Sequence, residues 1–117
     1  DYISLDGAAT KEGDISEANA IKEVFGERAK DIPVSAPKTM FGNLLGASGA
    51  VDVIITVLAM EHGLIPPTLN LKNIDPKCAG LNFVRDKAKE HAINKALVIS
   101  RGRAGINACM TLEKASK

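Results

Sequence analysis

The longest apolar stretch of the chain, from Leu44 to Met60, restricts the possible folds more than any other feature. Asp52 lies in its middle, and an ionised aspartate at the centre of a membrane helix costs roughly 2.5–3.5 kcal/mol on insertion scales. Membrane-spanning helices also need about 20 apolar residues, whereas glycine, serine and aspartate interrupt this stretch. We therefore expect no membrane span. The pattern predicts a helix from about Asn43 to His62 that ends at Gly63 and is buried on most sides.

Shorter patterns on both sides of this helix predict alternating strands and helices. Asp14 stands where it can cap a helix, with Glu17 three residues later as in a capping box, and Gly26 is placed to end that helix. Strands or extended segments are expected at residues 2–5, 32–36, 82–84, 96–99 and 108–112, with a solvated connection at 87–94. The order β-α-β-α-β-β-β predicts an α/β fold rather than a barrel or a helical bundle.

Composition argues against several classes of function. The 15 Lys and Arg residues against 14 Asp and Glu leave a net charge of +1, so no basic surface indicates a nucleic-acid or anionic-membrane partner. Cys78 and Cys109 lack the spacing of metal ligands, so we expect reduced thiols and neither a metal nor another cofactor. Because no signal peptide is visible, we expect a cytoplasmic protein. The chain begins at Asp1, directly before a strand, so we expect a fragment of a longer protein.

Three loops that follow predicted strands form the candidate site: residues 6–10, 38–43 and 100–107. In open α/β sheets, binding and catalytic sites form at such strand ends. Each loop alone is a weak signal. Gly102 and Gly105 do not make a dinucleotide fingerprint, because no helix follows them. His62 and His91 lie among charged residues and are expected at the surface, and no serine or cysteine stands beside a base as a nucleophile would.

Taken together, the loops resemble a known family. The matching segments are DGAAT (residues 6–10) with acidic residues at 14 and 17, SAPK (35–38) followed by GNLLGA (42–47), and SRGRAGINA (100–108). In order and spacing these segments resemble the C-terminal part of the β-ketoacyl-acyl-carrier-protein synthases, which are condensing enzymes of the thiolase superfamily. The resemblance covers nearly the whole chain. It implies that residues 1–117 are the C-terminal domain of a longer subunit, with a thiolase-like layered fold in which a mixed sheet packs with a buried apolar helix.

Two catalytic positions of that family are changed here. Active members carry a His-Gly-Thr motif in the first loop and a Gly-His-Leu motif in the second, and those histidine positions hold Asp6 and Asn43. In the family's chemistry the two imidazoles donate hydrogen bonds to the enolate oxygen that develops when a malonyl thioester loses carbon dioxide. Lys38 matches the family's lysine, Glu17 matches its acidic residue, and Asn107 is a supporting residue of the third loop. The resemblance implies that no catalytic set is intact in this chain, since the nucleophilic cysteine belongs to the N-terminal part.

The effect of these replacements on catalysis can be estimated. Loss of one oxyanion donor costs about 2.7–4 kcal/mol, and an ionised carboxylate about 4 Å from the oxyanion adds up to ~4 kcal/mol of repulsion at an effective dielectric constant near 20. Asn43 keeps an amide N–H donor, so only the position of Asp6 is counted in full. The sum of ~7 kcal/mol corresponds to about five decades in rate. Ordinary condensation is therefore not expected.

The third loop differs as well. Arg101 and Arg103 replace phenylalanines of a family Gly-Phe-Gly-Gly segment that borders the acyl site, and Gly102 and Gly105 complete this acyl-site loop. These changes are similar to the chain length factor, or ketosynthase beta subunit, of type II polyketide synthases. That similarity implies a non-condensing subunit that forms a heterodimer with an active ketosynthase, works with an acyl carrier protein and shapes the tunnel of the growing chain. The isolated fragment is expected to self-associate through apolar surface that the rest of the subunit would cover.

Other interpretations stay open. A divergent 3-oxoacyl-[acyl-carrier-protein] synthase could still condense or transfer acyl groups by using Lys38 and Asn43, and the fragment by itself could have no autonomous function. Asn43 could also simply cap the apolar helix. We further expect Asp6 to form an ion pair with Arg101 or Arg103, because an acid and two bases enter adjoining loops. A separation beyond about 6 Å would exclude a strong pair.

Overall fold

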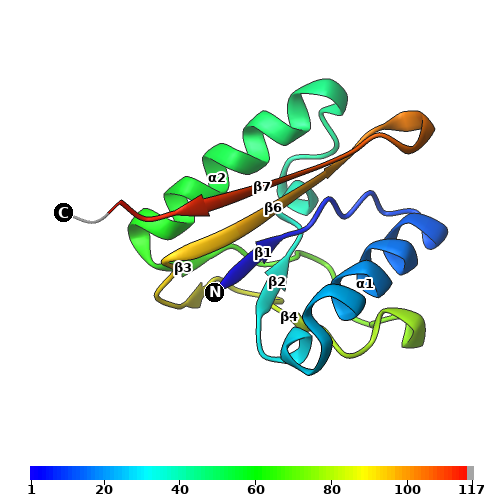
Figure 1. Ribbon diagram of the computed structural model, residues 1–117, viewed down its shortest axis with the longest axis horizontal. Helices are drawn as coiled ribbons and strands as arrows, with labels where there is room; N and C mark the ends of the chain where they lie inside the picture. Colours follow the sequence, from blue (N-terminus) through cyan, green and yellow to red (C-terminus); the bar gives the residue numbers. More distant parts are fainter. Residues whose placement is uncertain (116–117) are drawn as a thin grey trace.

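A computed structural model describes residues 1–115 as a five-stranded sheet with a helix on each face (Figure 1). The helices and strands are β1 (Tyr2–Ser4), α1 (Lys11–Phe25), β2 (Pro33–Ser35), α2 (Ser48–His62), β3 (Leu64–Ile65), β4 (Asn82–Phe83), β5 (Lys89–Glu90), β6 (Lys95–Arg101) and β7 (Asn107–Glu113). Short 3₁₀ turns connect them: η1 (Gly26–Lys30), η2 (Pro37–Met40), η3 (Leu45–Ala47), η4 (Pro76–Cys78) and η5 (Arg103–Gly105). This arrangement confirms the α/β class and the mixed sheet.

The strand order β4-β2-β1-β6-β7 brings the three candidate loops together. β1 lies parallel to both β2 and β6, with Ile3 opposite Val34 on one side and Leu97 on the other. Because these three strands run in the same direction, their carboxyl ends lie at one edge of the sheet. β7 returns antiparallel to β6 as a hairpin, with Arg101 opposite Asn107 at the turn. The loops after β1, β2 and β6 therefore meet at that edge.

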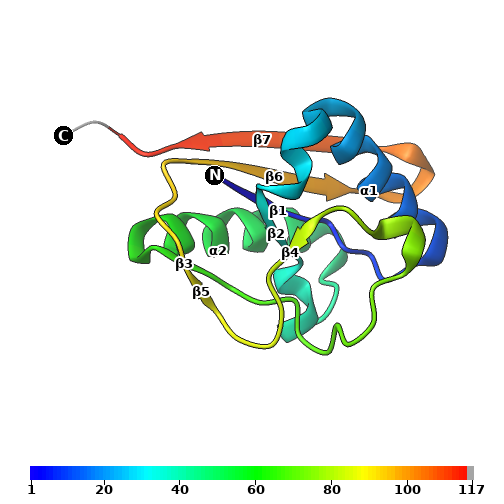
Figure 2. The ribbon, with the colours of Figure 1, turned by 90° about the horizontal axis from the view of Figure 1, so that it is seen from below.

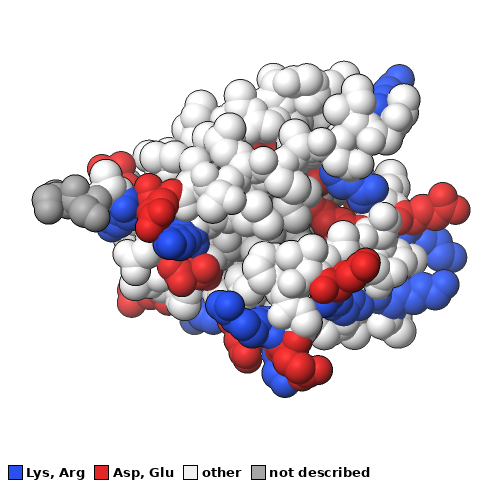
Figure 3. All heavy atoms as spheres, in the orientation of Figure 1, with Lys and Arg blue, Asp and Glu red and all other residues white. Residues whose placement is uncertain are grey.

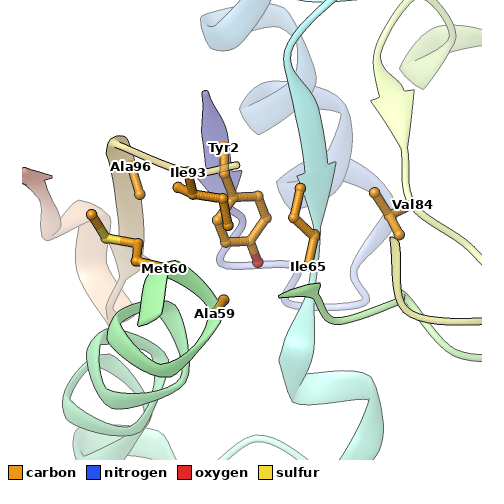
Figure 4. Close-up of a cluster of buried hydrophobic side chains, with 7 residues drawn as sticks. All are labelled: Tyr2, Ala59, Met60, Ile65, Val84, Ile93 and Ala96. Carbon is orange, nitrogen blue, oxygen red and sulfur yellow. The ribbon is translucent and has the colours of Figure 1, made fainter. Parts of the chain in front are cut away.

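The side chains of β1 alternate between the two faces and divide the core into two clusters. Tyr2 packs with Ala59 and Met60 of α2 (Figure 4), whereas Ile3 packs with Ile21 of α1. Successive side chains of a strand point to opposite faces, so α1 and α2 cover opposite sides of the sheet (Figure 2).

The helix α2 turns a polar stripe toward the sheet. Ser48, Asp52 and Thr56, which follow one another at intervals of four residues, are buried, and Asp52 and Thr56 are fully inaccessible. The apolar side chains of Ile54, Val57 and Leu58 are instead 58%, 47% and 46% exposed. The helix was predicted to be buried on most sides, but it is buried only on the side that faces the sheet.

By length and composition alone, the segment Leu45–His62 could cross a membrane. Its central residue Asp52 lies against the sheet and forms an ion pair with Lys38, which has its Nζ 3.4 Å from Asp52 Oδ2. The sequence-based expectation of no membrane span, which rests on this charge, stays a prediction.

The expected capping box at the start of α1 is wrong. The helix begins at Lys11 after Thr10, so Asp14 lies inside its first turn and does not cap it. Glu17 does not reach back to the helix terminus, because its carboxylate accepts hydrogen bonds from the N–H groups of Asp6 and Gly7 in the preceding loop. The end of the helix at Gly26 is as predicted.

Two further boundaries differ from the expectation. The apolar helix begins at Ser48 rather than Asn43, because Leu45 adopts a left-handed backbone conformation (φ 53°) that separates η3 from the preceding loop. The segment expected to be a solvated connection contains β5, which pairs antiparallel with β3 through Leu64 opposite Glu90. Gly63 ends α2 in the left-handed conformation as expected, with its N–H bonded to the Ala59 carbonyl.

The isolated 117-residue chain is expected to self-associate through the outer side of α2. Figure 3 shows few charged side chains over most of α2, while charges gather along the lower part of the molecule and near the C-terminal end of β7. Replacing Ile54 and Leu58 together by lysine should lower the mass measured by light scattering, because both side chains are exposed. Val24→Lys, at an apolar residue of α1 that is 75% exposed, is the matched control. A monomeric parent chain at high concentration would contradict this expectation.

The single tyrosine allows a direct test of the core. The chain has no tryptophan, the Tyr2 hydroxyl lies 2.8 Å from Ser35 Oγ, and burial raises the pKa of Tyr2 from 10.0 to about 12. Tyrosinate absorbance should therefore titrate near pH 12 in the folded chain and near pH 10 in denaturant. Since the fold favours the neutral phenol, its contribution to stability is complete below about pH 10 and is lost as the pH rises toward 12. A midpoint near 10 without denaturant would show that Tyr2 is not buried.

Candidate functional site

The three loops enclose a pocket of about 860 Å³ at the carboxyl edge of the sheet. Its lining combines all three segments, as predicted. It includes Asp6, Thr10, Asn43, Ser100, Arg101 and Arg103. Lys38 does not line the pocket and lies buried beneath it.

Lys38 is the centre of the polar network under the pocket. Its side chain is only 4% exposed. Its ammonium group donates hydrogen bonds to the backbone carbonyl of Asp6 and, at 3.0 Å, to Asp6 Oδ1, and it pairs with Asp52 Oδ2 at 3.4 Å. Two of its three N–H donors are thus used in hydrogen bonds to Asp6, and the contact with Asp52 is an ion pair without hydrogen-bond geometry.

Asp6 is held in place from both ends. Its carboxylate oxygen Oδ1 accepts a hydrogen bond from Lys38 and a second one, at 3.1 Å, from the backbone N–H of Arg101. Its own N–H donates to Glu17 Oε1 at 2.7 Å, and the N–H of Gly7 donates to Glu17 Oε2 at 3.0 Å. Burial raises the pKa of Glu17, and the N–H groups of Gly7 and Asp6 oppose this shift. Glu17 is thus a supporting residue that fixes the loop carrying Asp6.

Asp52 is a member of the site that we did not select from the sequence. It is fully buried, and burial raises its pKa although Lys38 acts in the opposite direction. Neither carboxylate oxygen has a partner at hydrogen-bond geometry, although Lys38 Nζ lies at ion-pair distance from Oδ2. Thr56 donates to the Asp52 backbone carbonyl. The available signal was the single acid inside the longest apolar stretch, since such a residue needs a buried partner.

The expected ion pair between Asp6 and an arginine is wrong. No carboxylate oxygen of Asp6 lies within 4.0 Å of a guanidinium nitrogen in residues 1–115, and Asp6 pairs with Lys38. The Arg101 guanidinium group donates to the Gly13 carbonyl at 2.7 Å and to Asn107 Oδ1 at 3.2 Å. Lys38 reaches Asp6 from β2's side of the sheet, so a buried cation already occupies the position that an arginine would need.

The third loop is fastened by Arg101 and Asn107, while Arg103 is exposed on the pocket wall. Asn107 accepts from Arg101 and donates through Nδ2 to the Gly105 carbonyl at 3.0 Å, which supports its predicted role in the loop. The N–H of Gly102 donates to the Ile106 carbonyl at 2.7 Å. Gly105 has a φ of 79°, which side chains rarely tolerate.

Asn43 caps a turn, not α2. Its Oδ1 accepts hydrogen bonds from the Leu45 N–H at 2.9 Å and from Ser48 Oγ at 3.0 Å. The N-cap position of α2 is Ala47. Asn43 therefore stabilises the 3₁₀ turn before the helix rather than the helix itself. Its amide nitrogen is left as a donor.

These contacts determine what the site can do chemically. At the position of the first family histidine the pocket offers the Asp6 carboxylate, which accepts hydrogen bonds and donates none when ionised. The described residues contain no group of three or more His, Cys, Asp or Glu side chains that could hold a metal ion. The arrangement can hold polar or acyl groups, but it lacks an imidazole donor for a developing oxyanion.

Comparison with known proteins shows the family of the chain. Residues 1–72 match the family model described as "Beta-ketoacyl synthase, C-terminal domain". The chain belongs to the β-ketoacyl synthase family. Its fold is the thiolase-like fold of that family, since it superposes on "The ishigamide ketosynthase/chain length factor" with a TM-score of 0.92 and 37% identity over 99% of this chain and 28% of that one.

Relatives of this β-ketoacyl synthase domain come from polyketide and fatty-acid synthesis. It is 38% identical to the tetracenomycin polyketide synthase ketoacyl synthase alpha subunit of Streptomyces glaucescens, over 97% of this chain and 26% of that protein. It is 41% identical to 3-oxoacyl-[acyl-carrier-protein] synthase 2 of Coxiella burnetii, over 97% of this chain and 27% of that protein. The chain thus spans about a quarter of the length of these relatives.

Replacing Glu17 by glutamine should destabilise the domain by about 1–3 kcal/mol. A glutamine oxygen can accept from the N–H of Asp6 or Gly7, but its NH₂ group would face the other N–H and leave that buried donor unpaired. Urea unfolding measures the loss. Glu23→Gln, at an exposed position of the same helix, is the control and should stay within about 0.5 kcal/mol of the parent. Equal stability of both variants would contradict the assigned role.

Proposed function

We propose that this chain is the C-terminal domain of a chain length factor-like subunit, which does not itself condense acyl units. In this proposal the complete subunit forms a heterodimer with an active ketosynthase and shapes the tunnel that receives the growing polyketide or fatty-acyl chain. An acyl carrier protein delivers that chain.

The observation that carries the proposal is the buried pair of Asp6 and Lys38. An active site of the family, as the resemblance implies, needs an imidazole donor where Asp6 lies. Here Asp6 Oδ1 is held by Lys38 Nζ at 3.0 Å and by the Arg101 N–H at 3.1 Å. Breaking a buried ion pair costs about 3–5 kcal/mol. The carboxylate is therefore a fixed structural element and a poor substitute for a proton donor.

The third loop supports a role in shaping a cavity. Arg101 is tied to Gly13 and Asn107, so it holds the loop against α1 and does not project freely into the pocket. Asp6, Asn43 and Arg103 line a pocket large enough for part of an acyl chain. A wall without catalytic donors can limit the length of a chain without reacting with it.

Solved relatives support the proposed partners. One structure, which resembles this chain with a TM-score of 0.93 and 35% identity over 97% of this chain and 28% of that one, contains a type II polyketide synthase acyl carrier protein in complex with its ketosynthase. Another pairs a ketosynthase with a chain length factor, as its name states. The exposed apolar side of α2 indicates that this domain, too, is covered by further protein. The cytoplasmic location expected from the sequence stays a prediction.

A divergent condensing enzyme is the second candidate. Two observations favour it: the amide nitrogen of Asn43 is left as a donor beside the pocket, and named relatives include a ketoacyl synthase alpha subunit and a 3-oxoacyl-[acyl-carrier-protein] synthase. The position of Lys38 argues against it, because its ammonium group is buried outside the pocket lining, donates two hydrogen bonds to Asp6 and pairs with Asp52.

Restoring the two histidines distinguishes the candidates. The test uses the full-length protein with an upstream cysteine. There the double variant Asp6→His and Asn43→His should strongly raise the rate at which malonyl-carrier protein is decarboxylated, by up to about five decades, the factor that corresponds to ~7 kcal/mol. Asn19→His, on the exposed surface of α1, adds an imidazole away from the site and should change nothing. Strong decarboxylation or condensation by the unaltered protein would refute the non-condensing role and favour the second candidate.

A further inference from the structure

An apolar groove of about 260 Å³, here called the α1 groove, lies between α1 and the β6–β7 hairpin. Ile21, Val24 and Phe25 of α1 line one side of it, and Leu97 and Ile99 of β6 line the other. None of these five side chains carries a charge or a hydrogen-bonding group. The groove has room for several methylene groups, and its apolar walls suit a hydrocarbon chain.

The α1 groove and the pocket of the candidate site adjoin at one side chain. Within residues 1–115, Arg101 is the only residue that lines both cavities. The turn between β6 and β7 and the first turn of α1 lie at the same end of the molecule (Figure 1), and Arg101 connects them there. A chain that passed from the pocket into the groove would therefore have to pass Arg101.

The guanidinium group of Arg101 is fastened across this junction. Its Nη1 donates to the Gly13 carbonyl in the first turn of α1 at 2.7 Å, and its Nε donates to Asn107 Oδ1 at the start of β7 at 3.2 Å. The side chain thus spans the two elements that border the groove. An apolar chain cannot replace these hydrogen bonds, and hydrogen bonds of a charged donor are stronger than those of a neutral one. The bonds therefore keep the junction closed.

We propose that Arg101 is a specificity-determining residue, which ends the acyl cavity on the α1 side and keeps the chain out of the α1 groove. This inference rests on the proposed function, in which the pocket receives an acyl chain. It adds the side chain that sets a limit on chain length and the place that a longer chain would occupy if that side chain were removed.

Straight-chain acyl amides of pantetheine, made in increasing length, test the inference on the full-length protein. Titration calorimetry measures the affinity for each length. In the parent protein the affinity should stop rising once the chain reaches Arg101. In Arg101→Ala, which keeps the backbone N–H that donates to Asp6, the affinity should go on rising by about fourfold for each added methylene group, as expected for burial of one CH₂.

A second substitution shows whether the gain comes from the groove. Ala20 is an exposed residue of α1 that lines the α1 groove and not the pocket of the site. Ala20→Phe fills the groove, so in the Arg101→Ala background it should restore the length limit of the parent. Arg28→Ala removes an exposed arginine that lines neither cavity. It is the matched control and should leave the whole series of affinities unchanged.

Arg101→Met decides the question if Arg101→Ala does not fold. Methionine keeps much of the length of the side chain but loses both hydrogen bonds, and its flexible apolar chain can move aside for a ligand. This variant should also bind the longer amides more tightly than the parent does.

Four outcomes would overturn the inference. These are the same dependence of affinity on length in Arg101→Ala and the parent, a gain that Ala20→Phe does not reverse, a crystal structure of Arg101→Ala with the end of a long chain outside the groove, or no binding of any amide. The proposed function fails on a different measurement, which is condensation by the unaltered protein. Binding of unreactive amides does not depend on which subunit condenses, so the two failures are distinguishable.

Discussion

The buried ammonium group of Lys38 is the interaction on which the rest of the site depends. Removing such an ion from water costs several kcal/mol, and only close opposite charges and hydrogen bonds repay this. Asp6 and Asp52 provide them at 3.0 and 3.4 Å, although the three residues come from the end of β1, the turn after β2 and the middle of α2. One cation thereby ties both neighbouring parallel strands to the helix beneath them. Any replacement of Asp6 acts on this network as well as on the pocket.

The same network explains the unusual orientation of α2. Its buried stripe is polar because Asp52 must reach Lys38, and Ser48 and Thr56 share that side of the helix. The apolar residues Ile54, Val57 and Leu58 then necessarily face away from the sheet. In a domain that spans about a quarter of its relatives, this outer side is the surface suited to contact further protein. The buried polar network and the exposed apolar surface are thus two sides of one helix.

Sequence reasoning predicted the site at the level of loops better than at the level of contacts. The rule that sites form at strand ends in open α/β sheets and the resemblance placed residues 6–10, 38–43 and 100–107 together, and the structure confirms that they meet. The arginine partner predicted for Asp6 was wrong because charge complementarity between loops does not reveal which cation is buried closer. The capping box was wrong for a similar reason: Glu17 has the correct spacing for a local bond, but two unpaired N–H groups of another segment compete for it. Asp52 was overlooked as a site residue because its partner lies 14 positions earlier in the chain, outside any local pattern.

The sequence by itself determined the α/β class and the family, because strand and helix periodicity and side-chain identity are local properties; the replacement of both family histidines is what the resemblance implies. Only the tertiary structure decided that Asp6 is locked by Lys38, that Arg101 serves the loop and not the carboxylate, and that α2 buries its polar side. These outcomes depend on which buried groups come within hydrogen-bond distance once the strands align. In a low-dielectric interior that proximity, rather than charge alone, selects the pairs.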